Sequence, residues 1–279
     1  MSASDILLKL NRVGYAYDAG NTAVFGVDLE LRCGEVILVA GANGAGKTSL
    51  LKLLGGFLLP TEGTIDFDGN DVLEIPEGRL DEWVAFVRTE GEKALVGPTV
   101  EDELARACRM CGLSGAAIPE RVGQALAAVQ LSSARNWYLD EMSMGERRRV
   151  ALAAALIGRP RIVIFDDPLA ELDAQGAHVV SKVLRDLARR GLAVVLSSHH
   201  LDPAVALADR VVVLDQGGVV LDGPPHRILA EEETLRQAGL PLPPAVELVR
   251  RLRERGIVKS DRIPITIDET VAFLLEELN

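Results

Sequence analysis

The sequence predicts an α/β fold with a mainly parallel central sheet. Short apolar runs of strand length recur along the chain, and segments with the helical spacing of apolar residues lie between most of them. Because these runs are apolar at nearly every position, they indicate strands that are buried on both faces, as in a parallel sheet covered by helices. The predicted strands are residues 36–40, 84–87, 162–165, 194–196 and 211–214.

Size and charge restrict the class of protein. The chain has 279 residues, 48% of them hydrophobic, which is enough for one large domain with an appendage. Its net charge of −11 leaves no broad excess of lysine and arginine, so nucleic acid is not an expected partner. The start of the chain lacks a signal-peptide pattern, and no apolar run approaches the ~18 residues of a membrane span. We therefore expect a soluble, cytoplasmic protein.

Two residue clusters have a structural interpretation beside a functional one. Arg147, Arg148 and Arg149 form a basic run that we interpret as one solvent-exposed helix face. Cys108 and Cys111 form a single C-x-x-C pair with no second ligand pair and no histidine nearby in sequence. A zinc or redox site would need such ligands, so we interpret both cysteines as packed thiols on one face of a helix.

Helical and extended segments divide the chain. Residues 99–158 are rich in Ala, Leu, Arg and Glu, begin with the capping pattern Thr99-x-x-Asp102, and contain no strand candidate. We expect them to form an all-helical subdomain inserted into a core made of residues 1–98 and 159–239. After proline-rich turns, a helical extension at 240–279 ends in an amphipathic stretch that follows Thr266-x-x-Glu269.

The segment Gly41-Ala-Asn-Gly-Ala-Gly46-Lys47-Thr48 matches the phosphate-binding loop (P-loop) pattern G-x-x-x-x-G-K-[ST]. It follows a predicted strand and begins a predicted helix, so backbone N–H groups and the helix dipole converge on one anion. We expect Lys47 to reach the β- and γ-phosphates and Thr48 to ligate Mg²⁺. This context disfavours an ordinary glycine-rich turn and predicts a P-loop NTPase. The other predicted nucleotide-binding residues of the loop are Gly41, Asn43, Gly44, Ala45, Gly46 and Ser49.

Two adjacent acids, Asp166 and Asp167, follow the predicted strand 162–165. A P-loop protein needs a carboxylate at the end of a neighbouring strand to hold Mg²⁺, and Asp166 is in that place. The alternative interpretation of Asp166 is an aspartate that caps a helix. Asp167 is then the candidate to position or polarise the attacking water.

A third motif, Met142-Ser143-Met144-Gly145-Glu146, resembles the LSGGQ signature of the ATP-binding cassette (ABC) ATPases. The order of P-loop, signature, acid strand, Leu172-Asp173 and Ser198-His199 is also that family's order. The resemblance covers about residues 7–239 and implies an ATPase that uses ATP and Mg²⁺. Ser143 and the free N–H groups after it would form a second anion site at a helix N-terminus. Two chains arranged head to tail would each offer this site to the γ-phosphate held by the other.

The resemblance implies roles for four further residues. Tyr17 matches the aromatic residue that stacks on adenine, although a tyrosine near a strand edge could equally be packing. His199 matches the histidine that contacts the γ-phosphate and the attacking water. Asp173 matches the loop that touches the partner chain, a role compatible with capping a helix. Thr89 stands where the family has a glutamine that ligates Mg²⁺ and senses the membrane partner.

This chain departs from the family pattern at several of these positions. Thr89 is shorter than glutamine and lacks its amide. Asp167 replaces a glutamate, and a shift of a reacting group by about 1 Å can cost ~100-fold in rate. In the signature, Met144 adds bulk and Glu146 adds negative charge at the second anion site. We therefore expect nucleotide to bind well and hydrolysis at this chain's own acid to be slow.

The segment 97–100, the stretch 201–214 and above all the tail after residue 240 are similar to the ATPases of energy-coupling factor (ECF) importers. This resemblance implies that two ATPase subunits work with a transmembrane coupling protein and a substrate-capturing membrane subunit. Such a complex takes up vitamins, cobalt or nickel, with the ATPases on the inner face of the membrane. The family's tail helps dimerisation; here the sequence shows only that the tail is amphipathic.

Other functions remain as alternatives. A degenerate, weakly or non-hydrolysing regulatory subunit of a heterodimer would fit Thr89, Asp167 and the altered signature. An ABC protein acting on DNA or ribosomes would need a tandem cassette, a coiled-coil insert or a basic surface. A kinase would have no use for the signature helix. The sequence determines neither the transported solute nor whether the dimer contains one kind of subunit or two.

Overall fold

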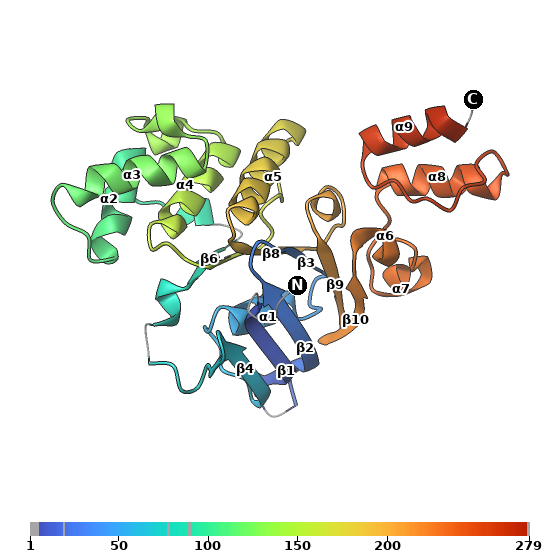
Figure 1. Cartoon of the computed structure of the whole chain (residues 1–279), viewed down its shortest axis with the longest axis horizontal. Helices are drawn as coiled ribbons and strands as arrows, with labels where there is room; N and C mark the ends of the chain where they lie inside the picture. Colours follow the sequence, from blue (N-terminus) through green and yellow to red (C-terminus); the bar gives the residue numbers. More distant parts are fainter. Residues whose placement is uncertain (1–5, 19, 77–78, 89–90, 278–279) are drawn as a thin grey trace.

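A six-stranded sheet forms the centre of the molecule (Figure 1). The structure, a computed structural model, describes residues 6–18, 20–76, 79–88 and 91–277. The strand order is β10-β9-β3-β8-β7-β6, and only β10 runs antiparallel to its neighbour. The strands are β3 (Val36–Ala40), β6 (Val84–Val87), β7 (Ile162–Phe165), β8 (Ala193–Ser198), β9 (Arg210–Asp215) and β10 (Gly218–Gly223). The predicted α/β fold with a mainly parallel sheet is therefore confirmed, as are all five predicted strands.

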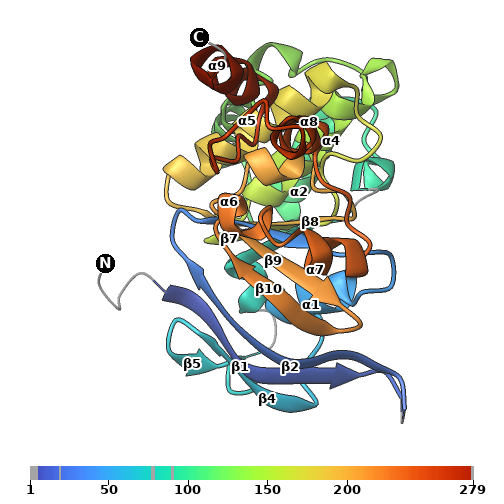
Figure 2. The ribbon, with the colours of Figure 1, turned by 90° about the vertical axis from the view of Figure 1, so that its right-hand side faces the viewer.

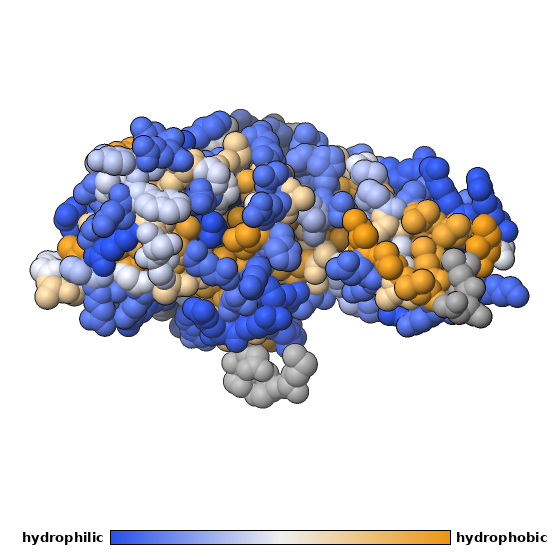
Figure 3. Space-filling model, turned by 90° about the horizontal axis from the view of Figure 1, so that it is seen from above, coloured by the Kyte–Doolittle hydropathy of each residue, from blue (hydrophilic) through white to orange (hydrophobic). Residues whose placement is uncertain are grey.

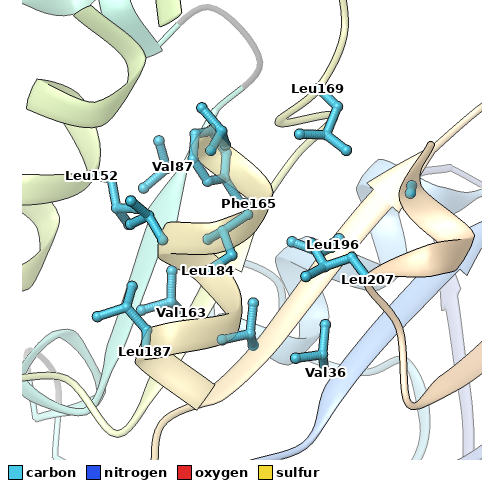
Figure 4. Packing of buried hydrophobic residues seen from close by; sticks show 14 of the residues in the cluster. Val36, Val87, Leu152, Val163, Phe165, Leu169, Leu184, Leu187, Leu196 and Leu207 are labelled. Carbon is cyan, nitrogen blue, oxygen red and sulfur yellow. The ribbon is translucent and has the colours of Figure 1, made fainter. Parts of the chain in front are cut away.

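Alternate residues of the central strands enter two separate apolar clusters. In β3, Ile37 and Val39 belong to one cluster, whereas Val36 and Leu38 belong to the other. The first cluster contains helix α1 (Lys47–Leu54), and the second contains residues of α4 (Met144–Leu156) and α5 (Ala174–Arg189). The second cluster is shown in Figure 4. Burial on both faces accounts for the unbroken apolar runs of these strands.

A second, antiparallel sheet, which is not among the predicted elements, covers the α1 side of the molecule (Figure 2). Its order is β2-β1-β4-β5, and irregular pairing breaks the period-two pattern that predicts a half-buried strand. In β1, for example, the register shifts between Leu10 and Val13, where Arg12 has a φ of 46°. The strands are β1 (Ile6–Ala16), β2 (Thr22–Arg32), β4 (Glu62–Phe67) and β5 (Asn70–Asp71).

The chain between β6 and β7 folds mainly into helices, which lie together at one end of the molecule (Figure 1). Thr99 caps the first of them by accepting a hydrogen bond from the Asp102 N–H, as its sequence pattern predicts. The helices are α2 (Val100–Met110), α3 (Ala117–Ala128) and α4. Short 3₁₀ turns in this segment are η3 (Gly91–Ala94), η4 (Ser132–Ala134) and η5 (Leu139–Glu141); η2 (Leu80–Glu82) precedes β6, and η6 (Ala204–Ala206) comes later in the chain.

Two interpretations of residue clusters in this region are partly wrong. Arg148 is only 2% exposed, so the three arginines do not share a solvated face. Its guanidinium is buried because it finds carbonyl and carboxylate acceptors in neighbouring segments. Cys111 is exposed, whereas Cys108 is buried. The pair is not packed on one face because α2 ends at Met110, which leaves Cys111 as the C-cap.

The C-terminal part of the chain is helical and carries its own small apolar cluster. Val249, Val258 and Phe273 form this cluster, and Thr266 caps the last helix through reciprocal hydrogen bonds with Glu269. The helices are α6 (Pro225–Ile228), α7 (Glu232–Gln237), α8 (Pro244–Glu254) and α9 (Ile267–Glu277). Apolar side chains also gather on the outer surface over these last helices (Figure 3). The most exposed of them are Leu248, Ile257, Ile267, Val271 and Leu275. Within the described ranges, no helix combines the length and apolar character needed to cross a bilayer.

Helix α5 packs against the central sheet, so a cavity opened between them should lower the stability of the fold. Leu184 is fully buried in the α5 cluster, so Leu184→Ala should lower the free energy of unfolding by about 2–5 kcal/mol. Lys182→Ala, on the exposed side of the same helix, should change it by less than about 0.5 kcal/mol. Urea denaturation followed by circular dichroism measures both values. Equal effects of the two substitutions would contradict this packing.

Candidate functional site

A cavity of about 600 Å³ opens at the carboxyl ends of β3, β7 and β8. Parallel neighbours end at the same edge of a sheet, so the loops that follow these strands meet there. Ten of the predicted site residues line this cavity, although they come from distant parts of the sequence. They are Tyr17, Asn43, Gly44, Gly46, Lys47, Thr48, Ser49, Asp166, Asp167 and His199.

The loop before α1 has the backbone of an anion cradle. Gly46, the N-cap of α1, has a φ of 98°, and a Cβ there would lie 2.4 Å from the carbonyl oxygen of Ala23. Only glycine therefore fits this position. Lys47 Nζ donates to the carbonyl oxygens of Gly41 and Ala42, at 2.7 and 2.9 Å. Burial lowers the pKa of Lys47, and the nearby Asp167 and Asp166 carboxylates oppose this shift.

Thr48 and Asp166 place two oxygen ligands opposite each other. The Thr48 hydroxyl lies 3.5 Å from Oδ2 of Asp166, across the gap between α1 and β7. The other oxygen of Asp166 accepts a short hydrogen bond from the Ser197 hydroxyl of β8. Because Ser197 holds one carboxylate oxygen, the second is oriented toward Thr48 and the cavity.

Asp167 and His199 form a hydrogen-bonded pair at the same edge of the sheet. His199 Nδ1 lies 2.7 Å from Asp167 Oδ2, and the Asp167 N–H donates to the Ser197 hydroxyl at 2.9 Å. Asp167 has a φ of 49°, a conformation that costs roughly 1 kcal/mol or more for a residue other than glycine. The neighbouring hydrogen bonds hold it in this conformation. The strained backbone thus presents the second acid to the cavity.

Tyr17 lies at the rim of the cavity and is 46% exposed. Its hydroxyl is 3.0 Å from the Ser49 hydroxyl of α1, and its ring meets Tyr15 edge to face. Since nearly half of its surface is open, the ring is available to stack on a planar group. Packing against Tyr15 covers only part of the Tyr17 ring.

The signature residues lie outside the cavity. Ser143 is the N-cap of α4, and its hydroxyl oxygen accepts from the Glu146 N–H at 3.3 Å. The Glu146 carboxylate accepts in return from the Ser143 N–H and hydroxyl, at 2.9 and 2.8 Å. Met144 is 40% exposed, and Gly145 continues the first turn of the helix. Glu146 thus closes a capping box at this helix end.

Four other predicted residues have different placements. Asp173 caps α5 by accepting from the Gly176 N–H at 2.6 Å, and it is exposed rather than part of the cavity. Gly41 and Ala45 belong to the loop before α1 and are buried beneath the cavity lining. A Cβ on Gly41 would lie 2.5 Å from the Leu214 carbonyl oxygen. Thr89 lies outside the described residues.

Several cavity residues were not identified from the sequence. Ser197 had a signal, because it lies at the end of a predicted parallel strand two residues before His199. The others are brought in by the antiparallel sheet and by the β9–β10 turn, whose positions depend on long-range packing. Gly217 in that turn, for example, donates to the Ala45 carbonyl oxygen at 3.0 Å. The residues without a sequence signal are Asn21, Thr22, Ala23, Gln216 and Gly217.

Comparison with known proteins agrees with this arrangement. The sequence profile described as ABC transporter matches residues 24–170, more than half of the chain. The energy-coupling factor transporter ATP-binding protein EcfA1 of Symbiobacterium thermophilum is 39% identical over 260 residues, covering 91% of this chain and 88% of that protein. The cobalt import ATP-binding protein CbiO of Syntrophus aciditrophicus is 34% identical over 258 residues, covering 91% and 92%.

A solved structure shows the same fold. The cbiO1 protein of Clostridium perfringens, described as part of the ABC transporter complex cbiONQ, matches with a TM-score of 0.77 at 28% identity. The match covers 91% of this chain and 100% of that one. With the P-loop, the paired acids and the signature in the family's order, these similarities identify the chain. It belongs to the ABC transporter family, as an ATPase related to the energy-coupling factor subunits.

Proposed function

We propose that this chain is the ATP-hydrolysing subunit of an ECF-type membrane importer for a metal ion or vitamin. The observation that carries the proposal is the single cavity in which Lys47, the Thr48–Asp166 pair and the Asp167–His199 pair meet. The names of the related EcfA1 and CbiO proteins support the transport role. We further propose that the chain acts on the inner face of the membrane, beside a transmembrane coupling protein and a substrate-capturing subunit.

ATP would bind with its base on Tyr17 and its phosphates on the loop before α1. Lys47 would exchange the Gly41 and Ala42 carbonyl oxygens for oxygens of the β- and γ-phosphates. Thr48 and Asp166 are the hard oxygen donors that suit Mg²⁺, which when bound neutralises phosphate charge. Among the residues described, no group of three or more His, Cys, Asp and Glu side chains is arranged to hold a metal ion, so phosphates and water would complete its shell.

Asp167 and His199 are the proposed catalytic residues. The hydrogen bond between His199 and one carboxylate oxygen fixes the orientation of Asp167. The other carboxylate oxygen would orient the attacking water and accept its proton. We propose that this acid reaches the water less well than a glutamate would, because its side chain is one methylene shorter. A non-hydrolysing regulatory role is disfavoured because Ser197 and His199 already hold the acid at the cavity.

A complete site would need a second subunit. Ser143 and the first turn of α4 lie outside the cavity, at an exposed helix N-terminus that favours anions. We propose that ATP closes two ATPase subunits head to tail, with each Ser143 facing the γ-phosphate held by the partner. Asp173, which is exposed near this surface, would contact the partner subunit. The apolar surface over α8 and α9 would add to dimerisation through the extension 240–279.

The role of Lys47 can be tested by calorimetry. Lys47→Ala should weaken ATP binding by roughly 10- to 100-fold, because it removes a charge-assisted contact worth about 1.5–3 kcal/mol. Lys52→Ala, on the same helix but outside the cavity, should leave the affinity unchanged. Unaltered binding by the Lys47 variant would place the nucleotide elsewhere.

The reach of Asp167 can be tested by lengthening it. Asp167→Glu should raise steady-state ATP turnover by about tenfold, because the added methylene moves the carboxylate by about 1 Å toward the water. The affinity for ATP should stay the same. Asp167→Asn, which removes the base without changing the length, serves as the inactive control. If turnover falls in the glutamate variant, the aspartate is already well placed.

The proposed dimer can be tested at the signature. Ser143→Arg should prevent dimerisation driven by a non-hydrolysable ATP analogue, because the larger cation blocks the close approach of the γ-phosphate. Ser114→Arg makes the same change at an exposed position in the α2–α3 loop and should not affect dimerisation. Light scattering after gel filtration measures the mass. A normal dimer from the Ser143 variant would rule out the head-to-tail arrangement.

A further inference from the structure

We propose that Arg148 is a positioning residue for ATP hydrolysis, an inference that rests on the proposed function. Arg148 lies in the second turn of α4 and is 2% exposed. It does not line the cavity, so it would act through other residues. A guanidinium is buried at high cost unless its donors are satisfied. The segments that satisfy it therefore have to keep their positions.

The first segment held by Arg148 follows the two acids directly. One terminal nitrogen of the guanidinium donates to the carbonyl oxygens of Pro168 and Ala170, at 2.9 and 2.7 Å. The Ala170 N–H in turn donates to the Asp167 carbonyl oxygen at 3.3 Å. Because Asp167 has a strained backbone, its side chain depends on the shape of the loop behind it. Arg148 holds this loop through the Pro168 and Ala170 carbonyl oxygens without itself lining the cavity.

The second segment is η3, which follows the neighbouring strand β6. The other terminal nitrogen of Arg148 lies 3.3 Å from Oε1 of Glu92, and both side chains are buried. The end of β6 is itself joined to the acids, because the Asp166 N–H donates to the Val87 carbonyl oxygen at 2.9 Å. A displacement of the η3 segment would thus reach the acids through Arg148 as well as through the sheet.

The third element is α4 itself, which begins at the Ser143 cap five residues before Arg148. One rigid helix therefore carries both the residue that would meet the partner's nucleotide and the residue that holds the loop behind Asp167. Occupation of one site in the dimer would adjust the acid of the other through this helix. This is a mechanical route for coupling between two sites, carried by packed and hydrogen-bonded groups.

The geometry requires arginine rather than any cation. The two terminal nitrogens of the planar Arg148 guanidinium contact two carbonyl oxygens and one carboxylate oxygen. The ammonium group of a lysine is a single point charge and lacks this forked pair of nitrogens. Arg148→Lys keeps the charge and removes the fork. The adjacent Arg149 provides a matched control, because it also donates to two carbonyl oxygens. Its acceptors, however, are Val129 and Gln130 at the end of α3, away from the acids.

The experiment compares Arg148→Lys with Arg149→Lys in the full chain. We expect Arg148→Lys to lower kcat for ATP hydrolysis at least tenfold, with KM and ATP affinity within twofold of wild type. Both lysine substitutions should lower the melting temperature by similar amounts, but Arg149→Lys should change kcat by less than twofold. Glu92→Gln should also lower kcat, because it weakens the contact between Arg148 and η3. A kcat within twofold of wild type for Arg148→Lys, or equal losses of kcat in both lysine variants, would overturn the proposal.

Hydrogen–deuterium exchange without nucleotide provides a readout that does not depend on turnover. Peptides covering residues 168–173 and 92–95 should exchange faster in Arg148→Lys and at the wild-type rate in Arg149→Lys. Unchanged exchange in these peptides of the Arg148 variant would overturn the proposed positioning. If the wild-type protein fails to hydrolyse ATP, the proposed function is wrong, and this exchange pattern still decides whether Arg148 holds the loop.

Discussion

The parallel pairing of β3, β8 and β7 is the constraint from which the site follows. Ala40 of β3 pairs with Ser198 of β8, and Phe165 of β7 pairs with Leu196. This register ends three strands at one edge, so the P-loop, the two acids and His199 leave the sheet within reach of one another. These strands are packed on both faces, and this packing fixes their register whether or not the cavity holds a ligand. Ligands therefore meet a preformed edge, and less ordering is required when they bind.

Most of this edge could be predicted from the sequence because its signals are local. The spacing of the glycines and Lys47 after strand 36–40 predicts the P-loop. The two acids are predicted because they follow an unbroken apolar run. The antiparallel sheet was missed because bulges such as the one near Arg12 hide its alternation. Without that sheet, nothing in the sequence brings Ala23 to the P-loop, and Gly217 reaches it from the β9–β10 turn of the central sheet. The contacts of these residues depend on how two sheets pack.

Charged side chains show where pattern reasoning fails. Arg147, Arg148 and Arg149 are chemically identical neighbours, yet only Arg148 enters the core. Its burial depends on acceptors 20 and 22 residues later, at Pro168 and Ala170, and on the carboxylate of Glu92. A run of like charges contains no information about such partners. Glu146 is a similar case: the sequence predicts only added negative charge at this position, whereas in the structure its carboxylate closes a capping box with Ser143.

In the proposed dimer, the residues that depart from the family pattern would face two different ATP molecules. Asp167 would serve the ATP held by its own chain, whereas Met144 and Glu146 would face the ATP held by the partner. In a homodimer, each site would combine the short acid with the altered signature. In a heterodimer with an unaltered partner, one site would carry only the short acid and the other only the altered signature. The slow step would then differ between the two sites, and α4 would connect them, because Ser143 and Arg148 lie on one helix.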